Sequence, residues 1–180
     1  MRCAALLRGV NLGGRKLLMS DLAEICTEVG LEAPRTLLAS GNVVFTTDSS
    51  VVDVEASLEA ALARFGLKTD VLVRDGAELD QVIRANPFGD AVRDHPSHVL
   101  VTFHRRPFPP DALERLRAAH AGPEQVVAIN RELFVDYNGR EQMRASTLLA
   151  GMRKARLPAI ATARNWNTVM KLAEILRSSS

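Results

Sequence analysis

An apolar run, Cys3-Ala4-Ala5-Leu6-Leu7, is followed by a basic, glycine-rich stretch, Arg8-Gly9-Val10-Asn11-Leu12-Gly13-Gly14-Arg15-Lys16. A helical pattern starts a few residues later, near Ser20. A strand, a glycine-rich loop and a helix in this order can form an anion-binding site. Glycines let main-chain N–H groups turn toward a ligand, and the helix dipole adds positive potential. The same stretch can equally form a loop with a purely structural role.

The loop does not match the best-known nucleotide-binding motifs. Its last glycine is followed by Arg15-Lys16, and not by the Gly-Lys-Ser/Thr ending of a P-loop. The dinucleotide fingerprint requires a parallel βαβ unit, which the order of elements given below does not provide. An anion site and a shaped structural loop therefore both stay open.

A second polar stretch, Thr162-Ala163-Arg164-Asn165-Trp166-Asn167-Thr168, leads into the last helical pattern. Either asparagine can cap this helix, and Arg164 lies where an anion would sit near its N-terminus. We expect the single tryptophan to fill a packing position rather than to stack on a base. The ligand-binding residues predicted from the two stretches are Arg8, Asn11, Gly13, Gly14, Arg15, Lys16, Arg164 and Asn165.

Charge is unevenly distributed along the chain. The net charge of the 180 residues is +2, but residues 1–96 hold ten basic and fourteen acidic side chains. Residues 97–180 hold thirteen basic and seven acidic side chains. One strip is strongly basic and contains Arg140, Arg144, Arg153, Lys154, Arg156 and Arg164. Such a strip can follow a phosphate backbone, so a nucleotide or a nucleic acid is the predicted partner. A solvated surface in an arginine-rich chain explains the strip equally well.

The composition is ordinary for a globular protein, with 47% hydrophobic and 24% charged residues. No apolar run approaches the roughly 20 residues that a membrane span requires, and the first residues lack a signal-peptide pattern. Cys3 and Cys26 fall at apolar positions, which predicts buried free thiols in a reducing compartment. We expect a cytoplasmic protein that uses no metal and no cofactor. The oligomeric state stays open.

Hydrophobic periodicity gives the same order of elements twice. Residues 1–75 and residues 97–164 each predict β-α-β-β-α-β, and a final helix follows. We therefore expect an α+β protein built from two ferredoxin-like βαββαβ units, a duplication, with a C-terminal helix. The predicted units are residues 1–83 and 98–180, and the linker between them is 84–97, which holds two prolines.

Several local features are predicted as well. Ser20 is expected to cap the first helix, and Gly30 to end it. Ser40-Gly41-Asn42 is typical of a hairpin turn, which we place at the end of the sheet opposite the loop that starts at Arg8. One helical face is expected to contain Met143, Leu148, Leu149 and Met152.

Catalytic motifs are mostly absent from the sequence. The four histidines, His95, His98, His104 and His120, show no metal-binding spacing, and no nucleophile elbow or kinase motif occurs. Whether the chain is an enzyme is left open. The favoured hypothesis is a binding protein for a phosphorylated ligand. The alternatives are a small metal-independent enzyme that acts on an anionic metabolite, and a structural or interaction protein.

Three motifs together resemble those of DUF1697, a family of bacterial proteins of unknown function: Arg8-Gly9-Val10-Asn11-Leu12-Gly13-Gly14, Ser40-Gly41-Asn42-Val43-Val44-Phe45 and Arg164-Asn165-Trp166-Asn167-Thr168. The resemblance covers nearly the whole chain and implies a duplicated ferredoxin-like α/β fold. It implies no catalytic residue, cofactor or substrate. The chain departs from the family pattern at Ala39, where glutamine is expected, and after Gly139, where a Ser-Lys-Leu run is missing.

Overall fold

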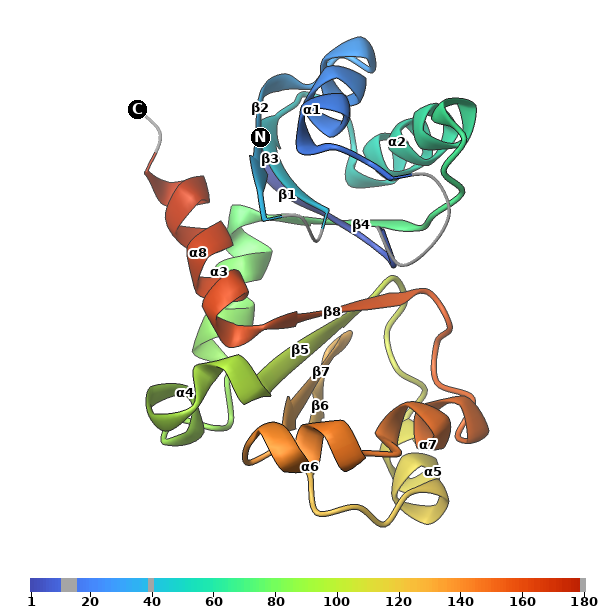
Figure 1. The fold of residues 1–180 in the computed structure, drawn as a ribbon, viewed down its shortest axis with the longest axis vertical. Helices are drawn as coiled ribbons and strands as arrows, with labels where there is room; N and C mark the ends of the chain where they lie inside the picture. The colour runs from blue at the N-terminus through green and yellow to red at the C-terminus, as the bar shows by residue number, and fades with distance from the viewer. Residues whose placement is uncertain (11–15, 39–40, 179–180) are drawn as a thin grey trace. The chain divides into compact units, whose positions relative to one another are not determined.

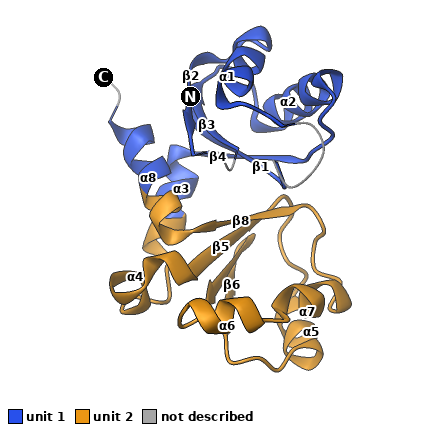
Figure 2. Ribbon diagram, viewed as in Figure 1, with its two compact units in different colours: residues 1–81, 171–180 blue, residues 82–170 orange. Residues whose placement is uncertain are grey.

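The computed structural model describes residues 1–10, 16–38 and 41–178. The chain forms two compact units, Met1–Gln81 with Lys171–Ser180, and Val82–Met170 (Figure 2). Each unit combines a four-stranded antiparallel sheet with helices, so the fold is a mixed α+β fold (Figure 1).

The first unit has the element order β-α-β-β-α-β, with a further helix after the last strand. Its strands are β1 (Arg2–Leu7), β2 (Glu32–Leu37), β3 (Asn42–Thr46) and β4 (Val71–Asp75). Its helices are α1 (Met19–Glu28), α2 (Val51–Phe65) and α3 (Gly76–Arg84), and the last three residues of α3 belong to the second unit. The strand order is β2-β3-β1-β4, so β1 lies inside the sheet.

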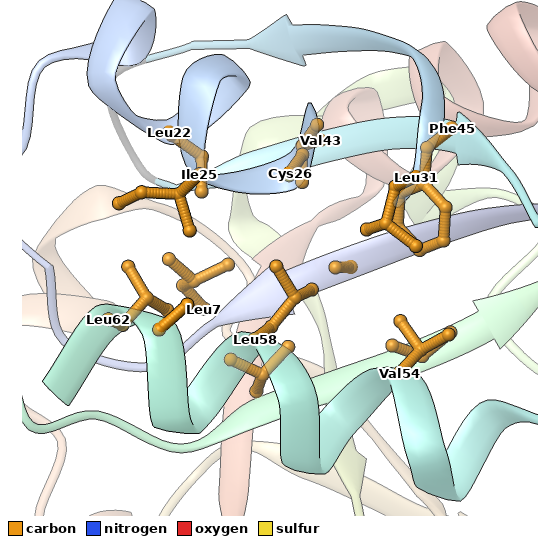
Figure 3. Packing of buried hydrophobic residues seen from close by; sticks show 14 of the residues in the cluster. Leu7, Leu22, Ile25, Cys26, Leu31, Val43, Phe45, Val54, Leu58 and Leu62 are labelled. Carbon is orange, nitrogen blue, oxygen red and sulfur yellow. The ribbon is translucent and has the colours of Figure 1, made fainter. Parts of the chain in front are cut away.

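Helices α1 and α2 cover one face of this sheet (Figure 3). Side chains alternate between the two faces of a strand, so Cys3, Ala5 and Leu7 of β1 point toward these helices. The helices contribute Leu22, Ile25, Cys26, Val54, Leu58 and Leu62 to the same cluster. Every residue of β1 from Cys3 to Leu7 is fully buried, as expected for a strand inside the sheet.

Local hydrogen bonds explain where α1 ends and where α2 begins. Gly30 has a φ of +82° and ends α1, as predicted, and the N–H of Leu31 donates to the carbonyl of Cys26. The helix starts two residues earlier than a Ser20 cap implies: its first residue is Met19 and its N-cap residue is Leu18. At the start of α2, the Ser50 side chain accepts a hydrogen bond from the N–H of Asp53.

The second unit repeats the order β-α-β-β-α-β, with two short helices in the place of the second one. Its strands are β5 (Val99–His104), β6 (Gln125–Ile129), β7 (Glu132–Asp136) and β8 (Ala161–Asn165), in the order β6-β7-β5-β8. Its helices are α4 (Ala91–Asp94), a 3-10 turn (Pro96–His98), α5 (Ala112–Ala119), α6 (Arg140–Ala145), α7 (Leu148–Lys154) and the first part of α8 (Trp166–Arg177).

Two features of this unit differ from the sequence-based expectation. The single helix predicted to carry Met143 and Leu149 is split into α6 and α7 at Ser146, and both of those side chains are exposed. The predicted linker, 84–97, contains the helix α4. The expected limits of the two units, 1–83 and 98–180, stay a proposal, and residues Lys171–Ser180 group with the first unit in the structure.

Candidate functional site

Three segments converge at one end of the first sheet. Because β1 is antiparallel to β3 and to β4, the end of β1 lies beside the start of both neighbours. The N–H of Leu7 donates to the carbonyl of Gly41 over 2.8 Å, and the N–H of Arg8 donates to the carbonyl of Asp70 over 3.0 Å. The hairpin turn at Gly41 is therefore next to the start of the glycine-rich loop. Our expectation that the two lie at opposite ends was wrong, because it overlooked this antiparallel pairing.

Arg8 is held firmly at this end of the sheet while its side chain reaches solvent. Its carbonyl accepts a hydrogen bond from the hydroxyl of Thr69 over 2.5 Å. Its guanidinium Nη1 lies 2.9 Å from Oδ2 of Asp70, and 49% of the arginine side chain and 32% of the aspartate side chain are exposed. The main chain of Arg8 is thus fixed on both sides, and its charge faces water.

Gly41 is needed where the turn meets the loop. Its φ is +73°, a conformation that other residues rarely adopt, and a Cβ at this position would lie 2.7 Å from Cγ2 of Val10. This close approach binds the hairpin turn to the first residues of the loop. Of the other residues predicted here, Lys16 is exposed. Asn11, Gly13, Gly14 and Arg15 lie outside the described residues.

The predicted residues of the second stretch belong to the second unit and make structural contacts. Arg164 is only 7% exposed, and its Nη1 donates to Oγ1 of Thr162 over 2.7 Å and to the carbonyl of Ala163 over 2.8 Å. Desolvation by burial lowers the pKa of Arg164 to about 10. Oδ1 of Asn165 accepts hydrogen bonds from the N–H and the hydroxyl of Thr168, so Asn165 caps α8.

The basic strip is spread over several elements of the second unit. Its exposed members lie on α6, on α7 and just after α7: Arg140, Arg144, Arg153, Lys154 and Arg156. Arg164 is buried in β8, so it does not continue an exposed surface.

A separate site is formed in the second unit by a pocket of about 350 Å³. Its lining comes from the end of α5, the connection to β6 and the junction of α6 and α7, and consists of His120, Gly122, Pro123, Glu124, Glu141, Gln142, Ala145, Ser146 and Thr147. Nε2 of His120 lies 2.8 Å from Oε2 of Glu124, and Nδ1 of the same ring lies 3.4 Å from Oγ1 of Thr147. A carboxylate, an imidazole and a hydroxyl are therefore connected in a row.

The His120–Glu124 pair is buried, whereas Thr147 is exposed. The exposed fraction of the side chain is 8% for His120 and 0% for Glu124. Burial alone would raise the pKa of Glu124, but the nearby Ser146 hydroxyl and the His120 ring outweigh it and lower this pKa from its ordinary value. The carboxylate is thus held in its ionised form.

Two glycines make room for this pair. A Cβ on Gly122 would lie 2.0 Å from Oε2 of Glu124 and 2.3 Å from Nε2 of His120. A Cβ on Gly151, inside α7, would lie 2.5 Å from Cβ of His120. Glycine inside a helix usually costs about 1 kcal/mol relative to alanine. At Gly151 the absence of a side chain lets the imidazole pack directly against the helix.

The family model for DUF1697, described as a protein of unknown function, matches residues 1–134. This chain belongs to DUF1697. The match includes the elements from β1 to α3 and the turn at Gly41, and it continues into β7. The family inferred from the sequence motifs is therefore confirmed, on a match that includes the first two motifs and ends before the third, which begins at Arg164.

The DUF1697 chain is also similar to a solved structure, that of a conserved bacterial protein from Streptococcus pneumoniae. The two are 20% identical, with a TM-score of 0.76 over 98% of each chain, which shows a shared fold. No curated protein matches the chain. Within residues 1–10, 16–38 and 41–178, no group of three or more His, Cys, Asp or Glu is arranged to hold a metal ion. In the same part of the chain, every helix is too short or too polar to cross a membrane.

Sequence reasoning missed the row of Thr147, His120 and Glu124 in this DUF1697 protein. His120 and Glu124 are four residues apart but lie in the connection after α5, where helical spacing has no meaning. Thr147 is 27 residues away from His120. No local pattern joins these three residues, and the available signals were the glycines at positions 122 and 151.

Proposed function

We propose that this DUF1697 protein binds a phosphorylated ligand, a nucleotide or a nucleic acid, at the end of its first sheet. The observation that carries the proposal is the placement of Arg8, whose main chain is fixed by Asp70 and Thr69 while about half of its side chain faces solvent. A guanidinium on a rigid support suits a phosphate, since its N–H donors lie in one plane and little motion is lost on binding.

The ion pair with Asp70 leaves most N–H donors of the Arg8 guanidinium available for such a ligand. The Nη1 bond to Asp70 uses one of the five N–H donors of the Arg8 guanidinium. Exposed ion pairs contribute roughly 0–1 kcal/mol, so a phosphate with a charge of roughly −2 competes well for the arginine. Lys16, at the other end of the loop, is exposed and adds a second positive charge.

The other predicted residues lie in the glycine-rich loop or in the second unit. Main-chain N–H groups at Gly13 and Gly14, with the side chains of Asn11 and Arg15, are included because of the glycine-rich sequence. Arg164 and Asn165 also belong to the predicted set, but their contacts stabilise β8 and α8. The proposed binding site therefore lies in the first unit. A cytoplasmic location, where nucleotides are abundant, is part of the same proposal.

A ferredoxin-like duplication is proposed as the framework of this site. It is supported by the matching strand orders, β2-β3-β1-β4 and β6-β7-β5-β8. Arg74 in β4 and Arg164 in β8 stand at equivalent positions and are both buried. Each is followed by a residue, Asp75 or Asn165, whose side chain accepts a hydrogen bond from the N–H three residues later.

Calorimetric titration with inorganic pyrophosphate, ATP and a short RNA oligonucleotide tests the binding proposal. At about 50 mM salt we expect binding of at least one probe, and at about 200 mM salt a clearly weaker affinity, because phosphate contacts release counterions. Replacing both cations (Arg8→Ala with Lys16→Ala) should weaken binding at least about tenfold, the loss of roughly 1.4 kcal/mol.

Arg93→Ala is the matched control for that double variant. Arg93 is also an exposed arginine, paired with Asp90 over 2.5 Å, but it lies in α4 of the second unit. This variant should bind as the unaltered protein does. Absence of binding at low salt, or equal affinity in the double variant, would show that the proposal is wrong.

A further inference from the structure

We infer that the pocket of the second unit is an acyl-transfer site in which Thr147 is the nucleophile, His120 the general base and Glu124 the residue that orients the base. The substrate class is a small carboxylic ester or thioester that is neutral or positively charged. The inference does not depend on phosphate binding by the first unit, because all of these residues lie within Val82–Met170.

The hydrogen bonds assign a role to each ring nitrogen of His120. An ionised carboxylate can only accept a hydrogen bond, so the 2.8 Å contact with Glu124 places a proton on Nε2. In the neutral imidazole, Nδ1 is then the acceptor, and the Thr147 hydroxyl, 3.4 Å away, is its donor. The hydroxyl proton is therefore directed at the nitrogen that can take it.

This arrangement has the same order of groups as a nucleophile–histidine–carboxylate triad. The buried Glu124 fixes the imidazole and stabilises the positive charge that appears when His120 takes a proton. Gly122 and Gly151 allow this position, since a Cβ on Gly122 would overlap both side chains and a Cβ on Gly151 would overlap His120. The nucleophile is the exposed member, so a substrate can reach it.

The first half of the reaction forms an acyl-enzyme. Oγ1 of Thr147 attacks the carbonyl carbon of the ester, and its proton passes to Nδ1 of His120. The tetrahedral intermediate then collapses, the bond to the leaving alcohol or thiol breaks, and the leaving group takes the proton from Nδ1. The acyl group is left as an ester on Thr147.

In the second half of the reaction, water hydrolyses the acyl-enzyme. Nδ1 of His120 takes a proton from a water molecule, whose oxygen attacks the acyl carbon. The bond between the acyl group and Oγ1 of Thr147 breaks, and the proton returns to the hydroxyl. The products are a carboxylic acid and the regenerated enzyme, so the net reaction is hydrolysis and no redox partner is needed.

The lining of the pocket sets the substrate class. Its volume of about 350 Å³ is at the small end of the range for ligand pockets. It contains the carboxyl groups of Glu124 and Glu141, and the described lining includes no lysine or arginine. A negatively charged substrate would therefore be repelled, whereas a neutral or cationic one would not.

Reaction with p-nitrophenyl acetate, followed by release of p-nitrophenolate and by mass spectrometry of the quenched protein, tests the inference. We expect turnover above the buffer rate and one acetyl group on the peptide that contains Thr147. Thr147→Val should lower the rate at least about tenfold and abolish the acetylated peptide, whereas Thr147→Ser should retain both. Thr147 makes no side-chain cap in α7 and is exposed, so these changes leave the fold intact.

His95→Asn is the matched control. His95 is also paired with a carboxylate, 2.9 Å from Asp136, and it does not line the pocket. Its variant should react at the unaltered rate. An unaltered rate in Thr147→Val, acetyl transfer only to His120 or to lysines, or a rate equal to that of buffer would overturn the inference.

Substrate charge is tested with two further p-nitrophenyl esters, the anionic hemisuccinate and a trimethylammonium-substituted ester. The anionic ester should react at least about tenfold more slowly than the cationic one, because like charges repel in the pocket. Glu141→Gln should reduce this difference several-fold, since it removes one of the two carboxylates. Equal rates for the two esters in the unaltered protein would show that the assigned substrate class is wrong.

Discussion

The guanidinium of Arg2 donates a hydrogen bond of 2.6 Å to the main-chain carbonyl of Leu176, which joins the first strand to the last helix. A second N–H of the same side chain donates to the carbonyl of Ile175 over 2.9 Å. Both carbonyls lie in the last turn of α8, where helical partners are missing and the helix dipole favours a positive charge. One arginine therefore connects two segments of the first unit that lie far apart in the sequence.

Arg2→Ala should destabilise the protein by roughly 1.5–3 kcal/mol, because two hydrogen bonds from a charged group to the carbonyls of Ile175 and Leu176 are lost. Urea denaturation followed by circular dichroism measures the change. Arg177→Ala is the control, since Arg177 is also in α8 but pairs with Asp80 at the exposed surface. That pair should contribute less than about 1 kcal/mol. Equal losses in the two variants would contradict the role given to Arg2.

Gly151→Ala should lower stability, although alanine is the better helix former. The new Cβ would lie 2.5 Å from Cβ of His120, so the ring or the helix must move, at a cost of roughly 1–3 kcal/mol. Gly76→Ala is a suitable comparison, because a Cβ at this first residue of α3 meets no atom within 4 Å. The thermal midpoint should fall in the first variant and stay equal or rise in the second.

Cys3 and Cys26 should resist alkylation in the folded protein. Burial raises the pKa of Cys3 to about 11 and that of Cys26 to about 12, so little thiolate exists at neutral pH. Iodoacetamide at pH 8 should label both quickly in urea and slowly without it. Because the folded pKa values exceed the ordinary 9.0, their contribution to stability is complete below pH 9 and is lost as the pH rises toward 11 and 12.

Glu124 should make the protein sensitive to acid. Its folded pKa is lower than the ordinary value of 4.5, so its contribution to stability is complete above pH 4.5 and is lost as the pH falls through the folded value. The urea midpoint of the unaltered protein should therefore drop further below pH 4.5 than the midpoint of Glu124→Gln. The exposed Glu141, changed to Gln, provides the comparison. If the urea midpoint of Glu124→Gln fell below pH 4.5 as much as that of the unaltered protein, the prediction would be wrong.

Local sequence signals predicted much of the first unit. The order β-α-β-β-α-β predicted for residues 1–75 is the order of the elements from β1 to β4. Gly30 ends α1 because a left-handed residue is needed there. These features depend on residues close in sequence, so periodicity and capping rules identify them.

The split between α6 and α7 could not be predicted from periodicity. Met143 and Leu149 are predicted on one helical face, but they are six residues apart, about 120° around a helix, and neither is buried. The hydroxyl of Ser146 accepts a hydrogen bond from the N–H of Leu148, a local contact that competes with a continuous helix. Apolar spacing showed that helix forms in this region, and only the side-chain contact shows where it stops.

The candidate sites depend on pairing and packing rather than on local signals. The meeting of Gly41 with Val10 follows from the antiparallel register of β1 and β3, which fixes the end of the sheet where each turn lies. The contact between His120 and Thr147 requires the helices of the second unit to be placed first. Such contacts between residues far apart in sequence carry no signal in a single chain without its fold.

The contact between Arg2 and Leu176 has a consequence for biosynthesis. A ribosome releases the chain from the N-terminus, so residues Val82–Met170 emerge in full before the segment from Lys171 onward that finishes the first unit. The N-terminal strand is synthesised first, but Arg2 can form its hydrogen bonds to α8 only after Ile175 and Leu176 have been synthesised. The later-encoded unit can therefore complete its folding earlier than the one whose translation began first.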